Sequence, residues 1–235
     1  MDIKILYEDN FIIVAEKPPK MPVQKDKTND LDLLSILKEK LSREHKVRNP
    51  YIGLIHRLDR PVGGAILYAK TKPANAFLSK ELQDRNIDKK YLAVVCGKPE
   101  TDQGVFIDKL LKIGSKNMSV VKDTKDAKEA VLEYKLIETT TTEEYGPLSL
   151  LEIDLRTGRH HQIRVQMSHH GLPLWGDTKY NNEFANKTGW SQIALWSYKL
   201  SFGHPKTKEI LNFISNPYDE YPWNLFSQLT TNSEQ

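Results

Sequence analysis

The part of the chain that follows Tyr91 is dominated by apolar runs typical of β-strands. Four such runs come one after another, at residues 91–96, 104–111, 130–137 and 148–155. Apolar runs of this length bounded by turn residues predict strands. Few helical patterns interrupt them, so the order of elements favours an α+β fold over the regular strand–helix alternation of a parallel α/β protein.

The remaining segments add further strands and three helices to this picture. Apolar runs predict strands at residues 3–7, 11–16, 65–69, 193–200 and 209–213. Asn29 or Asp30 is expected to cap a first helix, and Thr71 a second, because their side chains can accept hydrogen bonds from the first helical N–H groups. A basic helix is expected near residues 159–169.

The composition is that of a globular protein, and the length allows one large domain with a single core or one domain made of two lobes. The chain has 235 residues, of which 39% are hydrophobic and 28% charged, and this excludes disorder over most of its length. No apolar run approaches the ~18 residues of a membrane helix. The single cysteine, Cys96, excludes an internal disulfide and a multi-cysteine metal site. We therefore expect a soluble cytoplasmic protein with no membrane partner.

The segment 56–64, His-Arg-Leu-Asp-Arg-Pro-Val-Gly-Gly, is the first that is suited to chemistry. It places Asp59 between Arg57 and Arg60 on a tight turn. Nearby positive charge favours an ionised carboxylate, which suits a nucleophile or an electrostatic stabiliser better than a general acid. The alternative is a salt-bridged turn that only connects two strands.

The second such segment covers residues 155–164 and joins a predicted strand to the start of the basic helix. It carries three arginines and two histidines and contains no acid. Positive charge and the N–H groups of a helix start attract an anion such as a phosphate. Arg164 lies about one turn beyond His160 and His161, so the three can share a helix face. The alternative is a solvated basic face.

A metal site is the less favoured interpretation of the histidines in this region. His160, His161, His169 and His170 lie close together in the sequence, but no acid or cysteine stands at ligand spacing. The neighbouring arginines would repel a cation. We therefore expect no metal.

Taken together, the two segments resemble the RluA family of RNA pseudouridine synthases. The first matches the family motif His-Arg-Leu-Asp-x-x-Thr-Ser-Gly, and residues 156–165 match Arg-Thr-Gly-Arg-x-His-Gln-Ile-Arg-Val. Residues 171–180 match a trailing Gly-x-Pro-x-x-Gly-Asp-x-x-Tyr. The chain departs from the family at Val62-Gly63, where Thr-Ser is usual, and at Gln166, where a histidine often stands.

The resemblance implies a mixed, mostly antiparallel sheet in two lobes with a central active-site cleft. It implies one catalytic domain over residues 1–235, with a core at about 5–215, and none of the S4 RNA-binding module that some members carry. The implied activity isomerises specific uridines in tRNA or rRNA without a cofactor, with a monomer as the favoured form. A non-catalytic RNA-binding protein and a hydrolase that uses Asp59 are the alternatives.

The resemblance also assigns roles to individual residues. Asp59 matches the catalytic aspartate, Arg164 the arginine that pairs with it, and Tyr91 the active-site tyrosine. Arg57 matches the arginine that fills the gap left by a flipped nucleotide, an event that reaction on a stacked base requires. The further residues expected to contact RNA are His56, Arg156, Arg159 and Lys179.

Overall fold

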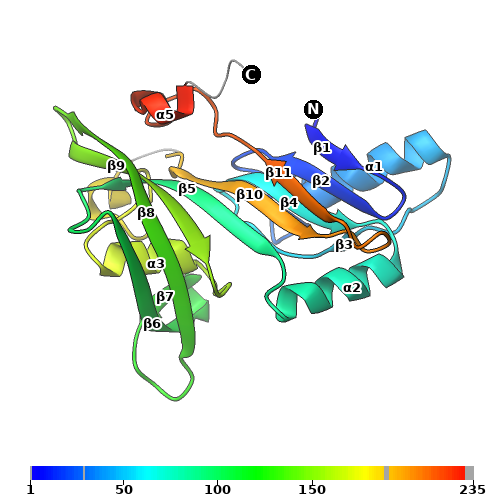
Figure 1. Ribbon diagram of the computed structural model, residues 1–235, viewed down its shortest axis with the longest axis horizontal. Helices are drawn as coiled ribbons and strands as arrows, with labels where there is room; N and C mark the ends of the chain where they lie inside the picture. Colours follow the sequence, from blue (N-terminus) through cyan, green and yellow to red (C-terminus); the bar gives the residue numbers. More distant parts are fainter. Residues whose placement is uncertain (1, 29, 188–190, 231–235) are drawn as a thin grey trace. The chain divides into compact units, whose positions relative to one another are not determined.

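The computed structural model describes residues 2–28, 30–187 and 191–230, and it has the α+β fold that the sequence predicts (Figure 1). The chain divides into two compact units. The first comprises residues 1–89 and 197–215, and the second comprises residues 90–196 and 216–235. The boundaries at 89/90 and 196/197 fall inside strands, and the one at 215/216 follows a strand.

The first unit is a sheet flanked by two helices. Its elements are β1 (Ile5–Glu8), β2 (Ile12–Lys17), α1 (Leu33–His45), β3 (Gly53–Leu54), β4 (Gly63–Ala69), α2 (Lys72–Gln83), most of β10 (Leu195–Gly203) and β11 (Ile210–Ile214). The strands run in the order β1-β2-β4-β10, with β11 beside β10 and β3 beside β4. The pairs β1–β2, β2–β4, β3–β4 and β10–β11 are antiparallel.

Strands β2 and β4 form the centre of this unit, and every residue in them is buried. Successive side chains of a strand point to opposite faces, so both faces of the sheet must be covered. Val14 and Leu67 pack on one face in a cluster that includes Ala74 and Leu78 of α2. Figure 1 shows α1 and α2 on either side of these strands.

The first helix starts later than its predicted caps. Asp32 is the N-cap residue, and its carboxylate accepts the N–H of Ser35 at 3.0 Å. Asp30 instead forms an ion pair with Arg60, and Asn29 lies outside the described residues. The buried positions of α1 begin at Leu33, so the cap directly precedes the first residue that packs. Thr71 caps α2 as predicted, accepting the N–H of its third residue at 3.2 Å.

The second unit contains the long strands. Its elements are β5 (Asp88–Cys96, from residue 90 on), β6 (Gln103–Ile113), a 3₁₀ turn (Gly114–Lys116), β7 (Met118–Val121), β8 (Lys128–Thr142), β9 (Gly146–Leu155), α3 (Gln162–His169), α4 (Asn182–Ala185), a second 3₁₀ turn (Trp223–Leu225) and α5 (Ser227–Thr230). Its strands run in the order β5-β9-β8-β6-β7, and each neighbouring pair is antiparallel. The sequence missed β7, whose four residues are too few to show a clear period.

Helix α3 is tied to this sheet by Gln166, which is fully buried. Its side-chain amide donates to the carbonyl oxygens of Phe106 at 3.3 Å and Ala130 at 3.2 Å, and to the carboxylate of Asp108 at 2.7 Å. The glutamine that departs from the family pattern therefore holds the helix in place. The helix begins at Gln162 rather than near residue 159, because His161 has a left-handed backbone with φ 55°.

No helix in the described ranges is long and apolar enough to cross a membrane.

Candidate active site

Asp59 lies in the connection between β3 and β4 of the first unit and is partly buried. Its carbonyl oxygen accepts the N–H of Val62 at 3.0 Å, which closes a tight turn. The neighbouring Arg60 donates from Nε to the carbonyl of Lys20 at 2.8 Å and pairs with Asp30. The turn that carries Asp59 is thus fastened to the loop after β2.

A buried lysine braces the same turn. Lys17, at the end of β2, has no exposed surface. Its Nζ donates to the carbonyl oxygens of Pro18 at 2.9 Å, Met21 at 2.8 Å and Arg60 at 3.0 Å. Sequence reasoning gave this residue no role. The available signal was a lysine directly after the predicted strand at residues 11–16 and directly before two prolines.

Burial sets the protonation of Lys17. Loss of solvent lowers the pKa of Lys17 to about 7, the negative charge of Asp59 opposes this shift, and the positive charge of Arg60 adds to it. In the unfolded chain the lysine holds its proton to a much higher pH. The unfolded state therefore binds more protons than the folded state above neutrality, and folding becomes more favourable as the pH rises.

We expect Lys17→Met to remove this pH dependence. Between about pH 7 and pH 9, the free energy of unfolding of the wild type should rise relative to that of the variant, by up to about 1.4 kcal/mol per pH unit. Below pH 7 the difference should be constant, since Lys17 is then charged in both states. Urea unfolding followed by tryptophan fluorescence at several pH values measures it.

The exposed Lys206 provides the matched control, since Lys206→Met removes the same charge from the surface. The difference in the free energy of unfolding between Lys206→Met and the wild type should stay constant across the same pH range. Parallel curves for the wild type and Lys17→Met would contradict the assignment of a buried, titrating Lys17.

The two residues before Leu58 lie in different surroundings. His56 is buried, and its Nε2 accepts the N–H of Leu67 in β4 at 3.1 Å. Burial, assisted by the charge of Lys89, lowers the pKa of His56 to about 3, so the ring is neutral at physiological pH. Arg57 is exposed, as an RNA-contacting side chain must be. The predicted RNA contacts of both residues stay predictions.

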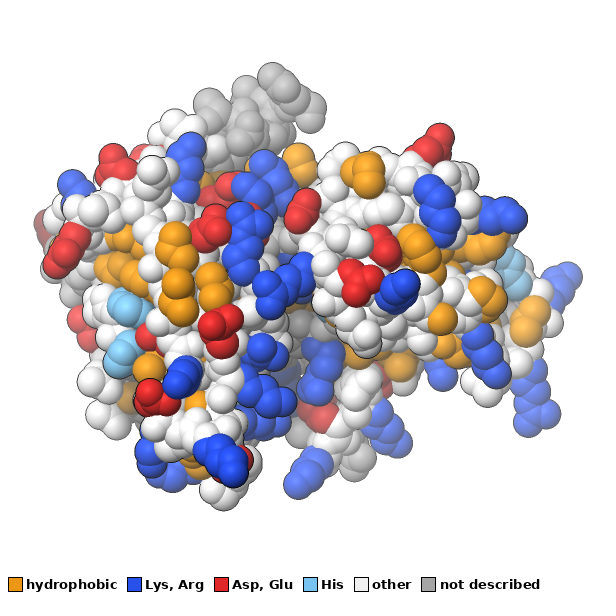
Figure 2. All heavy atoms as spheres, turned by 60° about the horizontal axis from the view of Figure 1, so that its bottom comes forward, with side chains coloured by type: hydrophobic (Ala, Val, Ile, Leu, Met, Phe, Trp, Pro, Cys, Tyr) orange, Lys and Arg blue, Asp and Glu red, His pale blue; other side chains and the backbone are white. Residues whose placement is uncertain are grey.

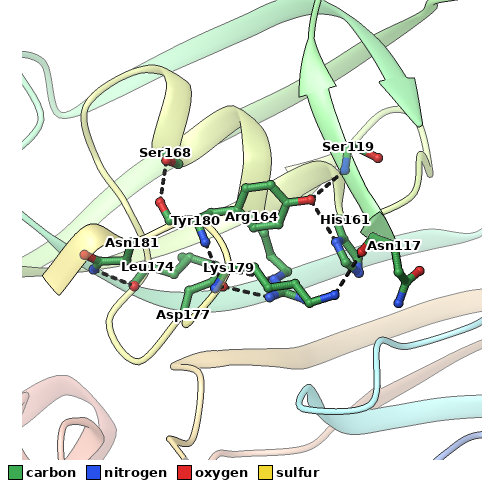
Figure 3. Close-up of polar contacts among 10 residues, drawn as sticks. All are labelled: Asn117, Ser119, His161, Arg164, Ser168, Leu174, Asp177, Lys179, Tyr180 and Asn181. Carbon is green, nitrogen blue, oxygen red and sulfur yellow. Dashed lines mark hydrogen bonds and ion pairs between the residues drawn. The ribbon is translucent and has the colours of Figure 1, made fainter. Parts of the chain in front are cut away.

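Tyr91 and Arg164 lie in the second unit. Tyr91 is buried in β5, where it is paired with Ile153 of β9. Arg164 is buried in α3 and makes a two-point ion pair with Asp177: Nε to Oδ2 is 2.8 Å and Nη2 to Oδ1 is 2.7 Å (Figure 3). The proposed approach of Asp59 to these two residues stays a prediction.

Tyr180 stands beside this ion pair. Its ring lies 5.3 Å from the guanidinium carbon of Arg164. Its hydroxyl oxygen accepts the N–H of Ser119 at 2.7 Å and is 2.9 Å from Nδ1 of His161 (Figure 3). Burial first, and then the charge of Arg164, lowers the pKa of His161 to about 2, which keeps its ring neutral. Sequence reasoning assigned no role to Asp177 or Tyr180; the signal was the trailing Gly-Asp-x-x-Tyr.

The three basic residues expected to contact phosphates are exposed in the second unit. Arg156 donates from Nε and Nη2 to the two oxygens of Glu133, both at 2.9 Å. Arg159 donates from Nε to the carbonyl of Glu129 at 2.8 Å, and Nζ of Lys179 donates to the carbonyl of Asn117 at 2.9 Å. The acid beside Arg156 offsets part of its charge. The predicted phosphate contacts of the three residues stay predictions.

One group of side chains in the described part of the chain has the spacing of metal ligands. It consists of Glu8, Glu44 and His45 in the first unit. The carboxylate of Glu8 already accepts Nζ of Lys40 at 2.7 Å and Nζ of Lys70 at 2.8 Å. Two lysines at these distances would oppose a cation, so we interpret the group as a salt-bridge network.

Comparison with known proteins identifies the family. The model of the RNA pseudouridylate synthase family matches residues 11–169. The chain belongs to this family. The match contains both predicted motifs, and the RluA-type resemblance seen in the sequence is confirmed. The synthase is therefore an isomerase that acts on RNA.

Curated relatives agree with this membership. The synthase is 32% identical to tRNA pseudouridine synthase C of Haemophilus ducreyi, over 97% of this chain and 96% of the relative. It is 35% identical to ribosomal large subunit pseudouridine synthase D of Neisseria meningitidis, over 91% of this chain and 58% of the relative. The solved human RNA pseudouridylate synthase domain containing 4 has the same fold, with a TM-score of 0.75 and 22% identity over 94% of this chain and 91% of that one.

Proposed function

We propose that this synthase converts specific uridines of tRNA or rRNA into pseudouridine, with Asp59 as the catalytic carboxylate. The observation that carries the proposal is the family match, which includes Asp59 in the first motif and Arg164 in the second. The relatives named above act on tRNA in one case and on the large ribosomal subunit in the other. Both RNA classes are therefore candidate substrates.

The reaction breaks the N1–C1′ bond, turns the uracil and joins C5 to C1′. The hydrogen on C5 leaves as a proton and N1 gains one, so the product has the mass of the substrate. A carboxylate can serve by attacking C1′, by assisting formation of a glycal or by adding to C6 of the uracil. Asp59 is the residue we assign to this step, whichever route applies.

Two residues of the second unit complete the proposed site. We assign to the guanidinium of Arg164 the ion pair that keeps Asp59 charged and oriented. We assign to the ring of Tyr91 stacking on the uracil, and to its hydroxyl a part in removing the C5 proton. The family model extends across the boundary between the two units, which supports one catalytic domain built from both. A cytoplasmic monomer stays a prediction.

Basic side chains support an RNA substrate. The net charge is only +3, so the distribution of charge matters more than its sum. Figure 2 shows a face on which Lys and Arg side chains gather, with acidic side chains scattered among them. Phosphate contacts of this kind position RNA and weaken with salt. Binding alone, however, does not require a carboxylate, which disfavours a purely RNA-binding role.

Tritium release tests the function directly. Transcripts of tRNA and rRNA labelled with tritium at uridine C5 are incubated with the synthase, and the tritium that enters water is counted. Isomerisation must release this hydrogen, whereas a hydrolase would free uracil that still carries it. Release without free uracil is the expected result. Free labelled uracil would overturn the proposal in favour of hydrolysis, and binding without release would favour the RNA-binding alternative.

Arg57 gives a prediction about substrate structure. If its exposed side chain occupies the gap left by the flipped uridine, Arg57→Ala should slow turnover of a stem-loop by about tenfold. An unstructured RNA of the same sequence context has no stack to open, so its turnover should change less than about twofold. Multiple-turnover tritium release on the two RNAs measures both effects.

Arg43 is the control for loss of a positive charge. It is exposed in the same unit, and its contact with Glu39 is a 3.7 Å surface ion pair. Arg43→Ala should affect both RNAs equally. An equal loss on both RNAs for Arg57→Ala would remove the flipping role and leave a phosphate contact.

A further inference from the structure

We infer that Asp177 is a positioning residue of the synthase, which fixes the guanidinium of Arg164 in the one orientation that serves Asp59. This inference rests on the proposed function, because it gives Arg164 the role stated there. Nothing in the sequence reasoning or in the comparisons assigns a role to Asp177.

Asp177 and Arg164 form a two-point ion pair. Nε and Nη2 of Arg164 face the two carboxylate oxygens of Asp177, at 2.8 and 2.7 Å (Figure 3). Two parallel contacts fix the plane of the guanidinium as well as its position, which a single contact does not. Arg164 is 4% exposed and Asp177 is 1% exposed, so water does not compete for these groups.

Asp177 is itself held by the backbone. Its Oδ1 also accepts the N–H groups of Lys179 at 2.9 Å and Tyr180 at 3.3 Å. The preceding Gly176 has φ +78°, and a Cβ there would overlap the carbonyl of Gln192. The loop that carries Asp177 is therefore closely packed against the backbone of Gln192, so the position of the Asp177 carboxylate is fixed.

The guanidinium of Arg164 also packs against an aromatic ring. The ring of Tyr180 lies 5.3 Å from the guanidinium carbon of Arg164, which suits a cation–π contact. The tyrosine is anchored at both ends: Ser119 donates its N–H to the hydroxyl at 2.7 Å, and Ser168 donates its hydroxyl to the carbonyl at 2.6 Å (Figure 3). The guanidinium is thus held along one edge and against one face.

These contacts define the direction of the rest of the guanidinium. Asp177 takes the edge formed by Nε and Nη2, so the adjoining end edge, formed by Nη1 and Nη2, has a fixed direction. The planar fork of an arginine can bind a second carboxylate along that edge. In the proposed mechanism that second carboxylate is Asp59. Asp177 therefore acts on the reaction through Arg164 and touches no substrate.

The test begins with Asp177→Asn, which keeps the shape of the side chain and replaces one acceptor oxygen with a donor. The guanidinium loses its two-point partner, so we expect kcat for tritium release to fall by about 10- to 100-fold. KM for RNA should change by less than about twofold, because Asp177 does not contact RNA. An unchanged kcat would overturn the inference.

Asp108→Asn is the matched control for damage to the same helix. The carboxylate of Asp108 accepts Nε2 of Gln166 at 2.7 Å and lies 3.1 Å from Nε2 of His170, so it anchors α3 without contacting Arg164. We expect its kcat to stay within about threefold of the wild type. An equal loss of kcat in both variants would mean that Asp177 only stabilises the helix, and this would overturn the positioning role.

A double-mutant cycle separates action through Arg164 from any other effect. If Asp177 works only by orienting this arginine, its loss has no further consequence once the guanidinium is gone. Arg164→Lys combined with Asp177→Asn should then be no slower than Arg164→Lys alone. If the two losses of kcat multiply in the double variant, Asp177 has a role that is independent of Arg164, and the inference is overturned.

The outcomes distinguish this inference from the proposed function. If Asp59→Ala turns over like the wild type, the proposed function fails, whatever Asp177 does. If Asp59→Ala is inactive and Asp177→Asn has the wild-type kcat, only the positioning role fails. Should Asp177→Asn not fold, Asp177→Glu replaces it: the charge stays, but the closely packed loop makes the longer side chain displace the guanidinium. A kcat about tenfold lower is expected, and a wild-type kcat would overturn the inference.

Discussion

Replacement of Asp59 by alanine is expected to abolish turnover, with a fall in kcat of at least about 10⁴-fold. The reaction needs an ionised carboxylate at the sugar or the base, and no other acid belongs to the first motif. Affinity for RNA should change by less than about twofold, since binding depends on basic side chains and on stacking. Single-turnover tritium release measures the first effect and filter binding the second.

Asp30→Ala is the matched control, because Asp30 also lies next to the turn. It is exposed and forms an ion pair with Arg60, the residue that follows Asp59. Loss of this surface pair should leave the fold intact and kcat within about threefold. Turnover of Asp59→Ala at the wild-type rate would contradict the assignment of Asp59 as the catalytic carboxylate. A large loss in Asp30→Ala would show that the turn, rather than the Asp59 carboxylate, is what matters.

Gly64→Ala is expected to have the largest effect on stability. Gly64 has φ +112°, a conformation that L-residues rarely adopt. A Cβ there would overlap the carbonyl oxygen of Ser197 and lie 2.7 Å from its backbone nitrogen. The contacting atoms are backbone atoms of β10, and they cannot move aside unless β4 and β10 separate. We therefore expect a loss of at least about 3 kcal/mol in the free energy of unfolding. Urea unfolding measures the loss.

Gly114→Ala provides the comparison. A Cβ at Gly114 would meet nothing within 4 Å, and its φ lies outside the left-handed range. The substitution should change the free energy of unfolding by less than about 0.5 kcal/mol. If Gly64→Ala were as stable as Gly114→Ala, the close approach of β10 to Gly64 would be wrong. Gly64 belongs to the Asp59 motif, so this motif serves the fold as well as the reaction.

The sequence alone predicted the α+β class, most of the strands and the family. Strands and helices each have a characteristic short spacing of apolar residues, which can be recognised from neighbouring positions in the sequence. The long motifs around Asp59 and Arg164 are specific enough to identify a family from one chain. The errors were the missed strand β7 and the boundaries of helices. Asp32 caps α1 because packing begins at Leu33, and two acceptors two or three residues earlier in the sequence were just as suitable chemically.

The tertiary structure decided which polar groups meet. Lys17 contacts the carbonyl of Arg60, 43 positions away in the sequence, and Asp177 contacts Arg164 across 13 positions. No local pattern encodes such pairs, because they depend on how the strands and loops pack. The surroundings of His56 also depend on packing. The sequence predicts that His56 contacts RNA, and in the structure its side chain is buried and accepts the N–H of Leu67 in β4. The sequence thus determined the family and predicted the catalytic residues, and packing determined which side chains hold those residues in place.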